Sequence, residues 1–229
     1  AAAAVQSPQM PRVHVHLGNA LRDRGLRAAA KGAYERALAL DSEHRPARTN
    51  LANLYYEAAQ ADSAQRERYV QQAIRQYSEV LKLDPTYREA LNNLGSAHMI
   101  LGDLARAEDI WNQAIKHHPH HAEAHFNMGL LQARMGRPIE AVPHYRRALA
   151  LGEDAEIYSE MGNAQAKVGR LTEAAIAYRR AIALSPGDMA SRYNLAEVLL
   201  VSGETDLAQG RGGLAKWREA QRELGTVLR

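Results

Sequence analysis

The stretch LGSAHMILG at residues 94–102 has three close counterparts in the chain, LGNALRDRG at 17–25, MGLLQARMG at 128–136 and MGNAQAKVG at 161–169. Each places a glycine after a large apolar residue and a second glycine seven positions later. The second glycines Gly102, Gly136, Gly169 and a further one, Gly203, lie 34, 33 and 34 residues apart. Gly25 lies 77 residues before Gly102, which is one ordinary repeat plus one enlarged by nine. A fixed period of this length predicts a repeat protein, and we expect each second glycine in a tight turn with positive φ.

A second pattern follows each turn. It is an alanine, an aromatic residue four positions later and a small or aliphatic pair three positions after that. The alanines are Ala30, Ala73, Ala107, Ala141 and Ala174, and the aromatic residues are Tyr34, Tyr77, Trp111, Tyr145 and Tyr178. Apolar residues recur with helical spacing, which predicts amphipathic helices. Small residues at the eighth position of each repeat let two helices approach closely. No pair of helices buries its apolar face alone, so neighbouring repeats must stack.

These residues resemble the tetratricopeptide-repeat (TPR) family, whose 34-residue unit is a helix–turn–helix. In this register the repeats start at Pro11, Arg45, Arg88, Ala122, Ala155 and Met189. The resemblance implies an all-α, right-handed superhelical solenoid over residues 11–208, with about five full repeats and a partial sixth. Residues 1–10 are expected to be an unstructured N-terminal segment.

Two regions depart from the repeat. The second repeat carries about nine extra residues around AAQADSAQRERYVQQ (58–72), and its good helix formers predict two longer helices. The sixth repeat fails after Ala208, where the glycines of QGRGG (209–213) break the helix. An amphipathic stretch from Leu214 to Leu228 follows, so residues 209–229 are predicted to form a Gly-rich break and a C-terminal capping helix. The alternative is that residues are missing from the sequence near Gly210–Gly213.

The composition argues against several classes of function. The 29 basic and 26 acidic residues are interspersed, with a net charge of +3, so no nucleic-acid partner is expected. The absence of cysteine excludes disulfides and thiol nucleophiles, and no apolar run approaches the roughly 20 residues of a membrane span. No phosphate loop, HExxH or GxSxG motif occurs. We therefore predict that the chain is not an enzyme and needs no cofactor.

The chain begins AAAA without methionine. This fits a mature end left by signal cleavage, an excised fragment, or residues written as alanine because their identity is unknown. An exported or periplasmic location is favoured over a cytoplasmic one. The few residues before the first repeat would cap its apolar face poorly. Self-association through the N-terminal repeat is therefore the alternative to packing on a partner there.

The resemblance also implies a concave groove lined by fixed positions of the first helix of each repeat. Position six reads His16, Asn50, Asn93, Asn127, Glu160 and Asn194, and position nine reads Asn19, Asn53, Ser96, Leu130, Asn163 and Glu197. Amides donate and accept hydrogen bonds, so such a row can hold the backbone of an extended peptide, similar to the asparagine ladder of O-GlcNAc transferase. The alternative is that asparagine is simply the common residue at position six in this family. The predicted groove residues are Asn19, Asn50, Asn53, Tyr56, Asn92, Asn93, Phe126, Asn127, Asn163 and Asn194.

Histidines gather in HHPHH at residues 117–121, and His125 follows on the next predicted helix. Imidazoles bind metal ions and haem iron, and His121 and His125 are spaced to share one helix face. The run lies in a turn between repeats, and no carboxylate or cysteine completes an evident closed site. We predict no metal site here; the weaker candidates are His117, His118, His120, His121 and His125.

The sequence therefore predicts a non-enzymatic scaffold that binds a peptide or partner subunit through its groove, in the assembly of a larger complex. Two alternatives stay open. One is an exported assembly or maturation factor that uses the cluster from His117 to His125 for a metal or haem. The other is a purely structural subunit of a multi-protein assembly.

Overall fold

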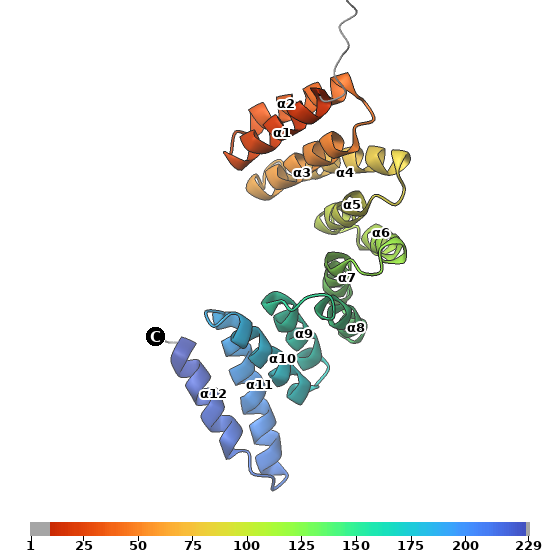
Figure 1. The fold of residues 1–229 in the computed structure, drawn as a ribbon. Coiled ribbons are helices and arrows are strands. Elements are labelled where there is room, and N and C mark those ends of the chain that lie inside the picture. Colours follow the sequence, from red (N-terminus) through yellow and green to blue (C-terminus); the bar gives the residue numbers. More distant parts are fainter. Residues whose placement is uncertain (1–9, 228–229) are drawn as a thin grey trace, which may run out of the picture. The chain divides into compact units, whose positions relative to one another are not determined.

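The structure is a computed structural model that describes residues 10–227, and these residues form twelve α-helices and no strand (Figure 1). The helices are α1 (Met10–Asp23), α2 (Arg27–Leu40), α3 (Arg45–Ala61), α4 (Arg66–Leu83), α5 (Arg88–Ile100), α6 (Leu104–His117), α7 (Ala122–Arg134), α8 (Pro138–Leu149), α9 (Ala155–Lys167), α10 (Leu171–Leu184), α11 (Met189–Ala208) and α12 (Leu214–Val227). The predicted unstructured segment 1–10 falls almost wholly on residues 1–9, which lie outside the described residues. The first helix begins at Met10, one residue before the predicted start of the first repeat.

Successive helices contact each other in pairs, so each odd-numbered helix is helix A of a repeat and the next is its helix B. The later helices A begin at the predicted starts of the second to sixth repeats. The predicted all-helical fold of stacked helix–turn–helix repeats is thus confirmed. The chain divides into two compact units, an N-terminal unit of residues 1–119 with α1–α6 and a C-terminal unit of residues 120–229 with α7–α12.

Within a repeat, helix A and helix B meet where a glycine faces an aromatic ring. A Cβ added to Gly18 would lie 2.4 Å from Cε1 of Tyr34, and one added to Gly162 would lie 2.7 Å from Cε1 of Tyr178. The same approach occurs at Gly95, against Trp111, and at Gly129, against Tyr145. The aromatic rings are fully or almost fully buried. No residue larger than glycine fits at these four positions without displacing a ring.

The turn glycines confirm the sequence analysis in four repeats and contradict it in one. Gly25, Gly102, Gly136 and Gly169 have φ between 75° and 77°, a left-handed conformation that glycine adopts without steric cost. The turn predicted at Gly203 does not form, because α11 continues through this residue to Ala208. A Cβ on Gly203 would lie 2.7 Å from Cδ1 of Trp217, so this glycine makes room for a ring of α12.

The second repeat is lengthened as predicted. Its helices α3 and α4 contain 17 and 18 residues, whereas α5 and α6 of the next repeat contain 13 and 14. Asp62 ends α3 and shapes the turn, since its Oδ1 accepts hydrogen bonds from the backbone N–H of Ala64 and Gln65. The extra residues therefore extend two packed helices rather than a loop.

The last helix, α12, covers the C-terminal repeat. Ala220 is fully buried in the core that α12 shares with α10 and α11. Ion pairs also connect α12 to α10 and α11. Arg179 of α10 binds Glu219 at 2.8 and 2.9 Å, and Arg192 of α11 binds Glu223 at 2.6 Å. Leu228, the last residue of the predicted amphipathic stretch, lies outside the described residues.

The outer face of α1 is apolar and open. Met10, Val13 and Leu17 are 44%, 59% and 45% exposed. Their spacing places them on one side of the helix. Such an apolar face is compatible with self-association through the N-terminal repeat. That self-association stays a prediction.

The close approach of glycine to ring gives a test with an internal control. We expect Gly18→Ala to destabilise the protein by about 1–3 kcal/mol, because its methyl group overlaps the buried Tyr34 ring. Gly32 lies within α2, and a Cβ there meets nothing within 4 Å. Gly32→Ala should therefore stabilise the protein by about 0.5–1 kcal/mol. Urea unfolding of both variants measures the difference, and equal stabilities would refute the packing account.

Candidate functional site

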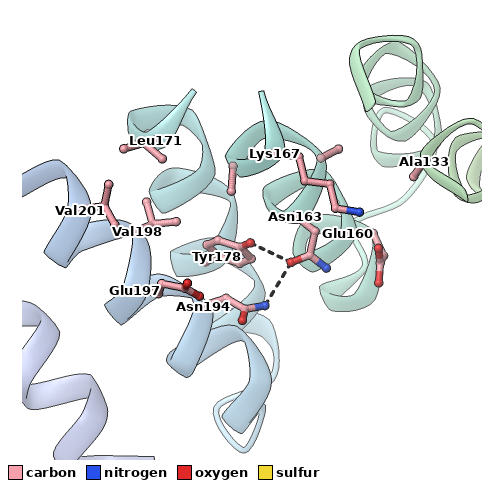
Figure 2. A pocket seen from close by; sticks show the side chains of 12 residues that line it. Ala133, Glu160, Asn163, Lys167, Leu171, Tyr178, Asn194, Glu197, Val198 and Val201 are labelled. Carbon is pink, nitrogen blue, oxygen red and sulfur yellow. Dashed lines mark hydrogen bonds between the residues drawn. The ribbon is translucent and has the colours of Figure 1, made fainter. Parts of the chain in front are cut away.

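Three side chains from three successive helices meet in the C-terminal unit (Figure 2). Oδ1 of Asn163 on α9 accepts a hydrogen bond of 2.7 Å from the hydroxyl of Tyr178 on α10. The same oxygen accepts a bond of 3.1 Å from Nδ2 of Asn194 on α11. The asparagine at position nine thus joins helix B of its own repeat to helix A of the next. We call this arrangement a Tyr–Asn–Asn triad.

The N-terminal unit contains two more triads. Oδ1 of Asn19 accepts from the Tyr34 hydroxyl at 2.7 Å and from Nδ2 of Asn50 at 2.9 Å. Oδ1 of Asn53 accepts from the hydroxyl of Tyr77 at 2.5 Å and from Nδ2 of Asn93 at 2.9 Å. Six of the predicted groove asparagines are thereby brought together in pairs across repeat boundaries.

Each triad uses a defined part of the hydrogen-bonding capacity of its amides. An amide oxygen has two lone pairs and an amide nitrogen has two protons. Both lone pairs of Oδ1 of Asn163 are occupied, whereas its Nδ2 has no partner among the described residues. The Oδ1 of Asn194 likewise accepts no bond within that part of the chain. The triad therefore keeps a donor and an acceptor for a ligand.

The tyrosine hydroxyl of each triad remains a hydrogen-bond donor. Burial raises the pKa of Tyr178 far above its ordinary value, and the nearby carboxylates Glu160 and Glu197 raise it further. Burial raises the pKa of Tyr77 in the same way. These tyrosines stay protonated at any physiological pH, so the triads do not open by ionisation.

A pocket of about 520 Å³ lies beside the triad of the C-terminal unit, between α9, α10 and α11. The side chains of Asn163 and Asn194 form part of its wall (Figure 2). Val198 and Val201 contribute an apolar surface. The charged residues of the lining are Glu160, Lys167 and Glu197. This combination of leftover amides, apolar surface and charge makes the pocket our candidate binding site.

The fourth repeat lacks the triad. Leu130 replaces asparagine at position nine, and Glu160 replaces asparagine at position six of the repeat that follows. The hydroxyl of Tyr145 is buried and has no hydrogen-bond partner among the described residues. The ring of Phe126 packs near the ring of Tyr145, and the two ring centroids are 6.1 Å apart.

One of the predicted groove residues, Asn92, is buried instead of exposed in the groove, and the other groove assignments stay predictions. Asn92 is only 6% exposed, its Nδ2 donates to Oδ1 of Asn93, and its backbone oxygen accepts from Nε1 of Trp111. It therefore belongs to the interior and does not offer its amide to a ligand. Tyr56 and Phe126 are partly buried against the hydrophobic cores of their own units. Asn127, on α7, is half-buried.

The candidate histidines have separate neighbours. His118 contacts the backbone oxygen of Thr86 at 2.5 Å, and His120 faces the guanidinium of Arg147 at 3.3 Å. His121 lies 3.5 Å from Glu123, and His117 is exposed at the end of α6. Within residues 10–227, no three His, Cys, Asp or Glu side chains are grouped so as to hold a metal ion.

His125 has a neighbour that the sequence analysis missed. Its ring lies against His144 of α8, with ring centroids 6.0 Å apart. The 19-residue spacing joins helix A to helix B of one repeat, and neither motif nor local periodicity marks it. The tyrosine hydroxyls of the triads were missed for a similar reason, because the aromatic residues were considered only as members of the repeat pattern.

Comparison with known proteins agrees with this geometry. Tetratricopeptide-repeat family models match residues 11–44, 86–154, 155–188 and 189–211. These matches leave residues 45–85, the lengthened second repeat, between them. No curated protein matches the chain. None of the helices in residues 10–227 has both the length and the apolar character that crossing a bilayer requires.

Several solved structures are similar to the chain. A thermophilic TPR protein of Thermus thermophilus is 26% identical, with a TM-score of 0.63 over 83% of this chain and 99% of that one. PilF of Pseudomonas aeruginosa is 20% identical, with a TM-score of 0.73 over 94% and 98%. YrrB, described as a TPR protein with an unusual peptide-binding site, is 21% identical, with a TM-score of 0.64 over 86% and 96%. The two likenesses below 25% identity concern the fold alone.

Two tyrosines in equivalent positions test the triad. Tyr178→Phe removes the bond to Asn163 and should cost about 0.5–1.5 kcal/mol of stability. Tyr145→Phe removes a buried hydroxyl that has no partner within the described residues, so it should leave stability unchanged or raise it. The midpoints of urea unfolding for the two variants provide the measurement. A Tyr145→Phe protein as weakened as the Tyr178→Phe protein would contradict the assignment.

The contact between the buried His125 and the half-buried His144 predicts a pH dependence. Burial and the neighbouring His125 lower the pKa of His144 below its ordinary value of 6.5, so the folded state binds fewer protons than the unfolded state. The stabilisation is complete above pH 6.5 and is lost as the pH falls from there towards the lowered pKa. We expect the melting temperature to fall between pH 7 and about pH 5.5. His144→Gln should reduce this slope, and substitution of the exposed His117 by Gln should not. An unchanged slope in the His144 variant would contradict the prediction.

Proposed function

Because the chain belongs to the tetratricopeptide-repeat family, we propose that it is a non-enzymatic scaffold that binds an extended segment of a partner protein along its helices A. TPR proteins generally bind protein or peptide partners. The segment would lie across the candidate pocket of the C-terminal unit. Its backbone would be held by the amides of the triad there.

The observation that carries this proposal is the hydrogen-bonding capacity left beside the pocket. Asn163 offers an N–H donor and Asn194 offers an oxygen acceptor. A peptide backbone presents the complementary C=O and N–H groups at every residue. Tyr178 holds the amide of Asn163, and Asn163 holds the amide of Asn194. Both amides are thus positioned before binding, which reduces the entropy lost when a complex forms.

A structural likeness supports the same reading. YrrB shares the fold and is described as having an unusual peptide-binding site. The fold thus accommodates a peptide in a protein of similar length. In this chain the triad gives a specific chemical reason for holding an extended backbone.

Selection of binders from a library of random dodecapeptides displayed on phage tests the proposal. A selected peptide is then synthesised with each backbone N–H methylated in turn. Methylation at one or two adjacent positions should weaken binding at least tenfold, because it removes the donor to Asn194. No enriched peptide, or binding that depends only on side chains, would overturn the proposal.

A protein variant provides the complementary measurement. In Asn163→Asp the carboxylate still accepts from Tyr178 and Asn194 but no longer donates to a peptide carbonyl. We expect at least fivefold weaker binding at about 0.5 M salt, which screens the added charge. Asn112→Asp adds the same charge at an exposed site of α6 and should leave the affinity unchanged. Urea unfolding verifies that both variants remain folded.

A further inference from the structure

Two carboxylates flank the triad of the C-terminal unit. Figure 2 shows Glu160 of α9 on one side of Asn163 and Glu197 of α11 beyond Asn194 on the other. Among the described residues, neither carboxylate takes part in an ion pair or a hydrogen bond. Other acidic residues of this unit do form ion pairs. Glu153 pairs with Arg180 at 2.6 Å, and α12 binds α10 and α11 through arginine–glutamate pairs.

The pocket is therefore negatively charged. Lys167 is its one cation, against Glu160 and Glu197, so the lining has a net charge of −1. Both carboxylates raise the pKa of the Tyr178 hydroxyl, so both act electrostatically on the triad. Glu160 also acts on the buried Tyr145. A cationic group that enters the pocket meets attraction from two sides.

The pocket also has an apolar surface next to this charge. Ala164 and Val198 are buried in its wall, and Val201 is 46% exposed at its edge. Lysine and arginine combine a long aliphatic stem with a charged end, and they pack the stem on apolar surface while the end stays polar. An acidic or small polar side chain would leave either the carboxylates or the valines without complementary contacts.

Resting on the function proposed above, we propose that this pocket is a subsite for a lysine or arginine side chain of the bound segment. The stem packs on Val198 and Val201, and the cation lies between Glu160 and Glu197. The neighbouring amides of Asn163 and Asn194 hold the backbone of the same segment. The partner is thus a basic, extended stretch of polypeptide.

Lys167 regulates access to this subsite. It is exposed and lies one helical turn beyond Asn163 on α9, and its side chain ends on the Glu160 side of the pocket (Figure 2). Its ammonium group forms no ion pair with Glu160 within 4 Å, so its charge repels a cation that enters the pocket. Removing the Lys167 charge should therefore strengthen the binding of basic peptides.

A double-mutant cycle on the full chain tests the subsite. The probe is a dodecapeptide obtained by the phage selection, in forms with lysine, glutamine or glutamate at the position where the selection favours lysine or arginine. Dissociation constants are measured by fluorescence anisotropy in low salt. On the wild-type protein we expect the lysine form to bind at least fivefold more tightly than the glutamine form, and the glutamate form to bind most weakly. In Glu160→Gln/Glu197→Gln the lysine form should bind no more tightly than the glutamine form, because only the Lys167 charge remains in the pocket.

Two single variants complete the design. Lys167→Gln should tighten binding of the lysine form about twofold or more. Glu173→Gln removes a charge of the same kind from an exposed position of α10 outside the pocket lining and should leave the preference intact.

The outcomes separate this inference from the function on which it rests. A selection without preference for basic residues, or a lysine preference that survives loss of both glutamates, overturns the subsite and leaves peptide binding standing. A preference for the glutamate form would mean that Lys167 governs the pocket and would also overturn it. A selection that yields no binding peptide would overturn both proposals. Thermal unfolding of each variant shows whether a lost preference reflects a lost fold.

Discussion

The structure depends on the contact between a glycine of helix A and an aromatic ring of helix B. In the fifth repeat the ring of Tyr178 lies where a Cβ of Gly162 would stand, so the ring packs directly on the backbone of helix A. This contact also fixes where the phenolic hydroxyl emerges, beside Asn163, the residue after the glycine. The packing of one repeat thereby places a hydrogen-bond donor at the boundary with the next.

The two interpretations of the asparagines, as a common residue of the family and as a peptide-binding row, turn out to be compatible. The oxygen of the position-nine asparagine has a structural task, since it receives one bond from its own repeat and one from the neighbouring repeat. Two bonds saturate that oxygen but leave the nitrogen of the same amide unused. One side chain thus links two repeats and keeps its Nδ2 donor for the proposed ligand. The structural task explains the position of the amide, and the unused groups support a binding role.

Much of the fold could be predicted because each 34-residue period of the sequence corresponds to one pair of helices that packs on the next pair. Repeat starts such as Arg88 and Ala155 follow from it directly. The period gives a wrong prediction at Gly203, which has the spacing of a turn glycine but lies in a continuous helix against Trp217. The period does not include α12, so the sequence could not show which ring would fill that space. The burial of Asn92 was also missed, although Trp111, whose Nε1 donates to the backbone oxygen of Asn92, belongs to the repeat pattern.

The candidate site was predictable only in its residue types. Asn163 and Asn194 were recognisable from their positions, but their bond requires that position nine of one repeat meet position six of the next. The distance between these two side chains depends on how successive repeats pack, and no local feature of a single sequence shows that packing. The departures from the repeat are more informative about function than its regular members. Tyr145 has no hydrogen-bond partner within the described residues because position nine of its own repeat is Leu130 instead of an asparagine, and at position six of the next repeat Glu160 gives the adjacent pocket a carboxylate. An unsatisfied buried hydroxyl lowers stability, so this repeat boundary gives up the link that the triads make elsewhere, and the acidic contact proposed for a bound partner would supply a gain in its place.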